Sequence, residues 1–218
     1  FWPQHGDDAE LLVRRADVAV NHAKQGGLRF TVYDQNKDPY SRRQLALAAE
    51  LRLAIRHDSL TLHYQPKINL RSGEIADVEA LVRWPHPQEG LIPPGDFIPL
   101  AEQTGLIRPL TLWVLDEALQ QCRTWVDAGL HLRVAVNLSA LNLQDPELPA
   151  QVSERLRVND ISPKQLILEI TESTIMADPI HAVAVLTKLR NMGVALSVDD
   201  FGTGYSSLSY LSRLPVSE

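Results

Sequence analysis

Residues 165–198 decide the fold and have the sequence QLILEITESTIMADPIHAVAVLTKLRNMGVALSV. The runs 165–171 and 194–198 are short and apolar, which is typical of buried strands. Between them, the pair Asp178-Pro179 predicts the start of a helix, because Asp caps the first turn and Pro fits its first position. A strand, a helix and a second strand in this order predict two parallel strands joined by a crossover helix.

The same alternation extends over most of the chain. Further strands are predicted at 60–68, 75–84 and 132–138, and helices at 41–57, 97–103, 106–127, 149–158, 179–192 and 207–213. This order predicts an α/β protein with a mainly parallel sheet, either closed as a barrel or open and doubly wound. Before it, residues 1–34 predict one helix and a strand at 28–33, which are too few elements for a core of their own.

The composition is that of a soluble globular protein. Of the 218 residues, 44% are hydrophobic and 22% are charged, and the net charge is −6. An acidic chain without a basic stripe is not expected to bind DNA or RNA, although a divalent metal would still let an acidic protein bind a phosphate. No apolar run approaches the roughly 20 residues that span a bilayer, so no membrane contact is predicted for this segment.

The single cysteine, Cys122, excludes an intramolecular disulfide and suits a reducing compartment. We therefore expect a cytoplasmic location, and a membrane anchor elsewhere in a longer parent protein would be compatible with it. Cys122 follows Leu110, Val114 and Ala118 at helical spacing, so it is predicted to be a small core residue. This apolar stripe on the predicted helix 106–127 is interpreted as core, with a homodimer interface as the alternative.

Polar side chains interrupt or end four of the predicted apolar strands. They are Glu79, Asn137, Glu169 and the pair Asp199-Asp200. In α/β folds, functional residues gather at the carboxyl ends of the strands. Oxygen donors without histidine or cysteine favour a hard cation such as Mg²⁺ or Mn²⁺ over zinc.

Each of these residues also has an ordinary structural explanation. A lone glutamate in a strand can face solvent or form a core ion pair, Asn137 can form a turn, and Asp199-Asp200 can cap a helix. The same pattern on four strands favours a shared metal site. The segment 201–207, FGTGYSS, follows the acidic pair directly and is predicted to be a mobile loop that could approach a phosphate.

Five separated motifs resemble those of EAL domains and follow the order of that family. They are EALVRW at 79–84, FIPLAE at 97–102, NLS at 137–139, EITE at 169–172 and DDFGTG at 199–204. The resemblance extends from about residue 44 to the last residue. It implies a modified TIM (β/α)₈ barrel with an antiparallel first strand. It also implies metal-dependent hydrolysis of cyclic-di-GMP to linear pGpG, with Mg²⁺ or Mn²⁺ as cofactor.

The resemblance further implies roles for individual residues. The implied metal ligands are Glu79, Asn137, Glu169, Asp199 and Asp200, and the implied catalytic residues are Glu79, Asp199, Asp200 and Glu172, with Glu172 anchoring the loop 201–207. Gln65, Leu81 and Arg83 are implied to lie at the bound ligand. Two metal ions bridging an in-line displacement would be the mechanism.

The domain organisation follows from two resemblances. Residues 1–34 resemble the end of a GGDEF domain, 35–43 are predicted to be a linker, and 44–218 are predicted to be an EAL domain. That family continues past the position of Glu218 with strands that carry a lysine and further acidic residues. We therefore expect an EAL domain that is incomplete at its C-terminus, and a fragment with weak or no activity.

Two rival functions remain open at this stage. They are an EAL-type receptor that binds cyclic-di-GMP without cutting it, and a protein-interaction domain that has lost ligand binding. A homodimer is a further expectation from the family. Asn69 stands where the family often has aspartate, which is a small departure from its pattern.

Overall fold

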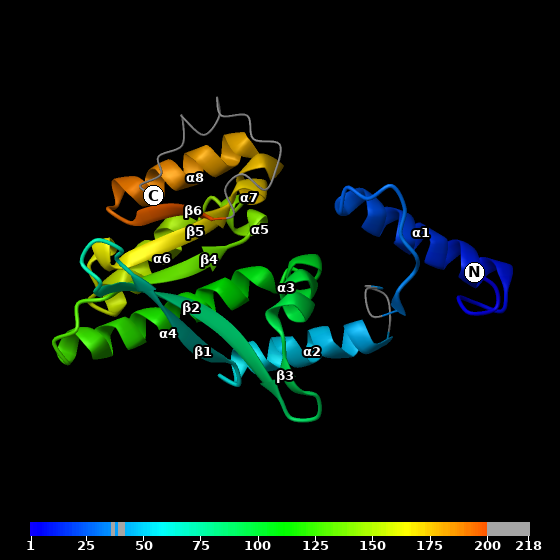
Figure 1. Ribbon diagram of the computed structural model, residues 1–218, viewed down its shortest axis with the longest axis horizontal. Coiled ribbons are helices and arrows are strands. Elements are labelled where there is room, and N and C mark those ends of the chain that lie inside the picture. The colour runs from blue at the N-terminus through cyan, green and yellow to red at the C-terminus, as the bar shows by residue number, and fades with distance from the viewer. Residues whose placement is uncertain (36–37, 39–41, 200–218) are drawn as a thin grey trace. The chain divides into compact units, whose positions relative to one another are not determined.

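The computed structural model describes residues 1–35, 38 and 42–199 (Figure 1). The chain divides into two compact units, Phe1–Leu53 and Ala54–Glu218. Helix α2 (Arg42–Arg56) carries the boundary between them and agrees closely with the predicted helix 41–57. Among the helices of the described ranges, none has the length and apolar character needed to cross a lipid bilayer.

The first unit contains α1 (Ala9–Gln25) and an extended tail that crosses it. The Asp8 carboxylate caps the helix by accepting a hydrogen bond from the Leu11 N–H at 2.8 Å. The strand predicted at 28–33 is wrong, because this segment forms no strand. A single apolar run has no neighbouring strand to pair with here, and the side chain of Tyr33 is held instead by a 2.6 Å hydrogen bond to Asp38.

The second unit is built on one mixed sheet of six strands in the order β1-β2-β4-β5-β6, with β3 paired to β2. The strands are β1 (Thr61–Ile68), β2 (Ile75–His86), β3 (Gly90–Ile92), β4 (Arg133–Leu138), β5 (Leu166–Thr171) and β6 (Ala195–Asp199). Strand β1 runs antiparallel to β2, whereas β2, β4, β5 and β6 are parallel. The α/β class and the antiparallel first strand are therefore confirmed, and the sheet formed by the described residues is open.

Helices connect the parallel strands as predicted. They are α3 (Pro94–Gln103), α4 (Ile107–Asp127), α5 (Ala140–Leu143), α6 (Leu148–Val158), the 3₁₀ turn η2 (Pro163–Gln165), α7 (Glu172–Ala177) and α8 (Pro179–Asn191). Helix α4 packs on β4 and on α6, and α6 packs on α8. Elements β3, α5 and α7 were missed because they are too short to show a period, and the helix predicted at 207–213 lies outside the described residues.

Strand β5 is the centre of the core. Leu166, Leu168 and Ile170 are buried on one face, and Ile167 and Glu169 are buried on the other. A parallel strand covered on both faces has a nearly continuous apolar sequence, as this one has. The burial of Glu169 is therefore imposed by its position in the sheet.

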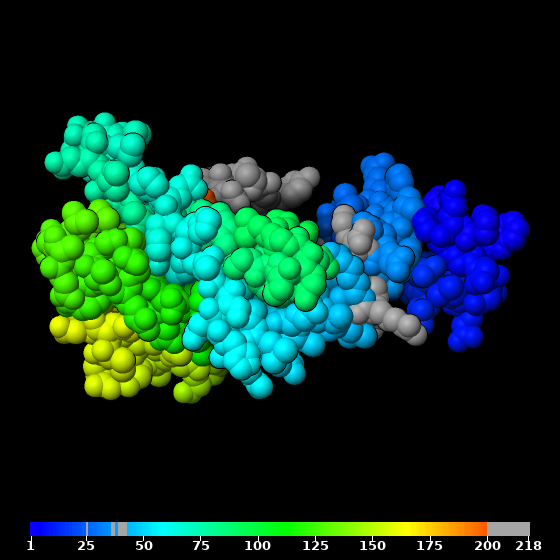
Figure 2. All heavy atoms as spheres, turned by 90° about the horizontal axis from the view of Figure 1, so that it is seen from below, coloured from blue at the N-terminus to red at the C-terminus, as the bar shows by residue number. Residues whose placement is uncertain are grey.

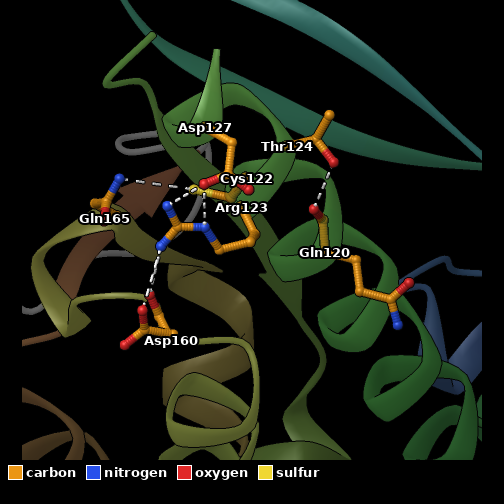
Figure 3. A network of polar contacts seen from close by, with 7 residues as sticks. All are labelled: Gln120, Cys122, Arg123, Thr124, Asp127, Asp160 and Gln165. Carbon is orange, nitrogen blue, oxygen red and sulfur yellow. Dashed lines mark hydrogen bonds and ion pairs between the residues drawn. The ribbon is translucent and has the colours of Figure 1, made fainter. Parts of the chain in front are cut away.

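The structure also shows how Cys122 of helix α4 is packed. Cys122 is buried, its Sγ lies 3.7 Å from the Leu132 carbonyl oxygen, and Gln165 Nε2 approaches the Sγ at 3.9 Å (Figure 3). Burial raises the pKa of the thiol. The neighbouring Arg123 binds the carboxylates of Asp127 and Asp160 at the surface. Cys122 is confirmed as a core residue, and the apolar stripe it belongs to is buried inside the unit, so it is no dimer face.

A tight turn joins β1 to β2 and stands out from the surface of this unit, in teal in Figure 2. The Asn69 side-chain oxygen accepts hydrogen bonds from the backbone N–H groups of Arg71 and Ser72, at 2.9 and 3.3 Å. Gly73 has a φ of 75°, which favours glycine. Aspartate would accept the same two bonds, which explains why asparagine is tolerated where the family often has aspartate.

An ion pair ties the amino ends of β2 and β4 together. The register places Asp77 opposite Arg133, and the guanidinium donates two hydrogen bonds to the carboxylate, at 2.6 and 2.7 Å. Asp77 is buried and Arg133 is partly exposed. This two-pronged geometry fixes the alignment of the two strands as well as balancing the charge of Asp77.

Replacement of Leu168 tests the assignment of β5 as the core strand. The side chain is 0% exposed, and Leu168→Ala is expected to lower the free energy of unfolding by about 2–5 kcal/mol through lost burial and a cavity. Urea denaturation followed by circular dichroism measures the change. Leu70, which is 97% exposed in the β1–β2 turn, is the matched control, and Leu70→Ala should change stability by less than about 0.5 kcal/mol. Similar losses from both substitutions would contradict the assignment.

A double-mutant cycle tests the Asp77–Arg133 pair. Asp77→Asn removes the buried charge and leaves the guanidinium without its counter-ion, so we expect a loss of about 1–3 kcal/mol in the free energy of unfolding. Adding Arg133→Met should recover part of that loss, because the uncompensated charge is then gone. Losses that simply add in the double variant would show that the two side chains act independently.

Candidate functional site

The strand registers bring the polar residues predicted for the site onto one face of the sheet. Glu79 is opposite Ala135, which lies two residues before Asn137 on the same face of β4. Asn137 is opposite Glu169. Thr171, two residues after Glu169, is opposite Asp199. The four predicted side chains therefore share a face of four adjacent parallel strands, with Glu79 in the first half of β2 and the other three in the carboxyl-terminal halves of their strands.

Three direct contacts join this set, and two of them involve a residue that the sequence analysis did not select. Asn137 Nδ2 donates a hydrogen bond to Glu79 Oε1 at 2.8 Å. Lys67 on β1 donates a hydrogen bond from its ammonium group to Glu169 Oε1, and the same ammonium lies 3.7 Å from Glu79 Oε2. Lys67 therefore links the carboxylates of β2 and β5.

The charges of this cluster shift the pKa of its members. Burial raises the pKa of the Glu169 carboxyl, the hydrogen bond and charge of Lys67 lower it, and the charges of Glu79 and Asp199 raise it, so that the overall direction is upward. Burial lowers the pKa of Lys67, but its hydrogen bond to Glu169 and the three surrounding carboxylates raise it by more. Burial is the largest cause for Glu169, whereas the three carboxylates around the Lys67 ammonium account for the rise in the pKa of Lys67.

The donor set fits a hard divalent cation. All four predicted donors are carboxylate or amide oxygens, which Mg²⁺ and Mn²⁺ prefer. Glu169 Oε2 is buried and has no hydrogen-bond partner among the described residues, which is costly for a carboxylate oxygen unless something else binds it. Within residues 1–35, 38 and 42–199, no three His, Cys, Asp or Glu side chains are already grouped to hold a metal ion. Asp200 lies outside these ranges.

A cavity of about 350 Å³ adjoins these residues at the carboxyl ends of β2 and β4. Leu81, Arg83 and Asn137 line it, together with Glu102 and Ser139. The Arg83 guanidinium donates a hydrogen bond to the Val82 carbonyl oxygen at 3.0 Å, and burial raises the pKa of Glu102. The cavity therefore offers one cation and several hydrogen-bonding groups beside the carboxylates.

The remaining predicted residues lie nearby or outside the described part. Gln65 is exposed on β1, opposite Glu79 in the register. Glu172 is buried at the first turn of α7, where the helix dipole favours a negative charge. Asp199 ends β6 and is exposed. The loop 201–207, which Glu172 is predicted to anchor, lies outside the described residues.

Sequence reasoning missed two residues of the site. Lys67 lies two positions after Gln65 and therefore on the same face of β1, a signal that the period of a strand could have provided. Glu102 lies near the end of α3 and closes the motif FIPLAE at 97–102, but that motif was not assigned a role at the site. Both residues come close to the site through tertiary contacts alone.

Comparison with known proteins gives consistent relatives. Over its full length the chain is 47% identical to the bifunctional diguanylate cyclase/cyclic di-GMP phosphodiesterase MucR of Pseudomonas aeruginosa, of which it spans 32%. Over 98% of its length it is 42% identical to the cyclic di-GMP phosphodiesterase PdeR of Escherichia coli, again spanning 32% of that protein. The chain thus covers about a third of the length of these curated relatives.

Solved structures give the same picture. The structure described as PaMucR phosphodiesterase in complex with c-di-GMP matches 79% of this chain and 70% of its own, with a TM-score of 0.75 and 52% identity. The FimX EAL domain of Pseudomonas aeruginosa bound to c-di-GMP matches 77% of this chain and 67% of its own, with a TM-score of 0.71 and 26% identity. These likenesses confirm the predicted TIM-like barrel fold class. Because the EAL domain profile also matches residues 48–218, the chain belongs to the EAL domain family.

Proposed function

We propose that the protein hydrolyses cyclic-di-GMP to linear pGpG with the help of Mg²⁺ or Mn²⁺. The observation that carries this proposal is the shared face of Glu79, Asn137, Glu169 and Asp199, next to the cavity that contains Arg83. Relatives that are named cyclic di-GMP phosphodiesterases support it, and so does the c-di-GMP complex of a homologue. The proposal applies to the whole protein that carries this chain.

The charges of the site support a metal-dependent reaction. A phosphodiester is an anion and would be repelled by the carboxylates of Glu79, Glu169 and Asp199, and the ammonium of Lys67 offsets part of this repulsion. Glu79, Asn137, Glu169 and Asp199, with Asp200, would hold the cation. When bound, the cation supplies a positive charge that polarises a phosphoryl oxygen and lowers the pKa of a bound water molecule.

The other residues are proposed to bind and orient the substrate. Arg83 would pair with a phosphate through its planar guanidinium, and Leu81 and Gln65 would contact the rest of the ligand. Glu172 would hold the loop 201–207 close to the site. Excluding bulk water there would strengthen every electrostatic interaction with the substrate.

The domain organisation 1–34, 35–43 and 44–218 is part of the same proposal. Residues 1–34 would be the end of a GGDEF domain, which is consistent with the match of the entire chain to a relative named a bifunctional diguanylate cyclase and phosphodiesterase. A cytoplasmic location and a homodimer remain predictions. Size-exclusion chromatography with light scattering of the full-length protein tests the homodimer, and a monomeric mass would contradict it.

Replacement of Glu79 tests the metal site. Glu79→Ala in the full-length protein is expected to lower Mn²⁺ affinity and hydrolysis by about 100-fold or more, because direct ligands matter more than the outer partners whose loss costs roughly 10–100-fold. Chromatography of pGpG and isothermal titration with Mn²⁺ measure the two effects. Glu74→Ala removes an exposed carboxylate from the same strand region and should change neither. Collapse of the fold in Glu79→Ala alone would show that Glu79 is structural.

Replacement of Arg83 separates substrate binding from metal binding. Arg83→Met is expected to weaken cyclic-di-GMP binding by about tenfold or more, since a charge-assisted pair with a phosphate contributes about 1.5–3 kcal/mol. Titration in Ca²⁺ is expected to report binding without turnover, and Mn²⁺ affinity should stay at the wild-type value. Arg71→Met in the exposed β1–β2 turn is the control. Wild-type protein that binds cyclic-di-GMP but yields no product in Mg²⁺ or Mn²⁺ would support the receptor function instead.

A further inference from the structure

Two acidic residues on one face of β2, Asp77 and Glu79, each lie close to a basic side chain, but the two contacts differ in geometry. Asp77 is held by Arg133 through two short hydrogen bonds. Glu79, two residues later, has the ammonium of Lys67 at 3.7 Å, and the same ammonium is hydrogen-bonded to Glu169. Lys67 is itself opposite Asp77 in the register, yet its side chain is directed to the next acidic position along the sheet.

The contact of Lys67 with Glu169 can be broken more easily than the pair formed by Arg133 and Asp77. A lysine ammonium is a compact charge on a flexible stem, whereas the planar guanidinium of Arg133 is fixed by two parallel bonds. The Lys67 side chain is 39% exposed, so it can reach water, while the Glu169 side chain it binds is only 5% exposed. The other oxygen of Glu169, Oε2, is buried and has no hydrogen-bond partner in the described ranges.

Lys67 enters the site from the amino-end side of the parallel strands. Its partner in the register, Asp77, lies near the amino end of β2. The ammonium therefore approaches Glu79 and Glu169 from the side of the amino ends of the parallel strands. The cavity containing Arg83 lies on the opposite side, at the carboxyl ends. A divalent cation that binds between the cavity and the carboxylates would therefore meet the Lys67 charge across Glu169, and like charges at short range repel each other.

We propose that Lys67 is a positioning residue that acts as a replaceable counter-cation of the metal site. In the metal-free protein its ammonium holds the carboxylates of Glu79 and Glu169 together. When a divalent cation binds, Lys67 gives up its hydrogen bond to Glu169 and turns to solvent. The site is thereby kept assembled without metal, at the cost of weaker metal binding. This inference rests on the proposed metal-dependent function.

Three variants of the full-length protein test the proposal. Lys67→Met removes the charge and keeps most of the stem, Lys67→Arg keeps the charge, and Lys188→Met removes an exposed lysine of α8 that has no carboxylate contact among those described. Mn²⁺ affinity is measured by electron paramagnetic resonance of free Mn²⁺. Thermal unfolding is measured in EDTA and in saturating Mn²⁺.

We expect Lys67→Met to bind Mn²⁺ about tenfold more tightly than the wild type, which corresponds to about 1.4 kcal/mol. Its melting temperature in EDTA should fall by several degrees, and its gain on adding Mn²⁺ should exceed that of the wild type. Lys188→Met should keep the wild-type Mn²⁺ affinity, and Lys67→Arg, which keeps the charge on a planar group that is harder to displace, should bind Mn²⁺ no more tightly than the wild type. If Lys67→Met does not fold, Lys67→Gln, which is also uncharged, has the same expected affinity.

Unchanged or weaker Mn²⁺ binding by the uncharged variants would overturn the proposal. Unchanged Mn²⁺ affinity with weaker cyclic-di-GMP binding in Ca²⁺ would do the same, because Lys67 would then be a substrate contact. In both cases normal wild-type turnover would leave the proposed function intact. A wild-type protein that binds no Mn²⁺ would overturn the proposed function and this inference together.

Discussion

The burial of a carboxylate at the centre of a parallel sheet is the constraint on which the site depends. Glu169 lies on β5 with paired strands on both sides, and its side chain is almost fully removed from solvent. A charge in such a place is costly unless an opposite charge or a metal balances it. The basic residues around the site reduce this energetic cost by pairing with the carboxylates.

The pairs of basic and acidic residues follow one another along the strands. At the amino ends, Arg133 neutralises Asp77 through a fixed pair that aligns β2 with β4. Closer to the middle of the strands, the Lys67 ammonium contacts Glu79 and Glu169, and one buried oxygen of Glu169 has no hydrogen-bond partner in the part of the chain that the structure describes. At the carboxyl ends, the cavity contributes the guanidinium of Arg83, and the proposed divalent cation would add the further positive charge that an anionic substrate requires.

The sequence predicted the long helices well because they have a clear helical period, and most of the strands because they are short apolar runs. Continuous apolar runs such as 166–171 and the capped start of α8 follow from local chemistry. The strand predicted at 28–33 is wrong because β structure needs a partner strand, and no strand of the described residues pairs with this segment. The strand registers place Glu79, Asn137, Glu169 and Asp199 on one face of the sheet, whereas their roles as metal ligands stay predictions. The contact of Lys67 with Glu169 could not be predicted, because it joins residues 102 positions apart.

The reversed direction of β1 explains why a lysine can take this place. In the antiparallel pairing, the chain reaches Lys67 late in β1, opposite the start of β2, and Gln65 is opposite Glu79. Lys67, near the end of this strand, therefore lies closer to the amino ends of the parallel strands than Glu79 does, while the neutral Gln65 lies directly opposite Glu79. Because the lysine stem is long, its ammonium can rise to the carboxylates or withdraw from them without any movement of the backbone. Under the proposed function, the antiparallel first strand thus supplies an exchangeable positive charge from the amino-end side of the sheet, away from the cavity that contains Arg83.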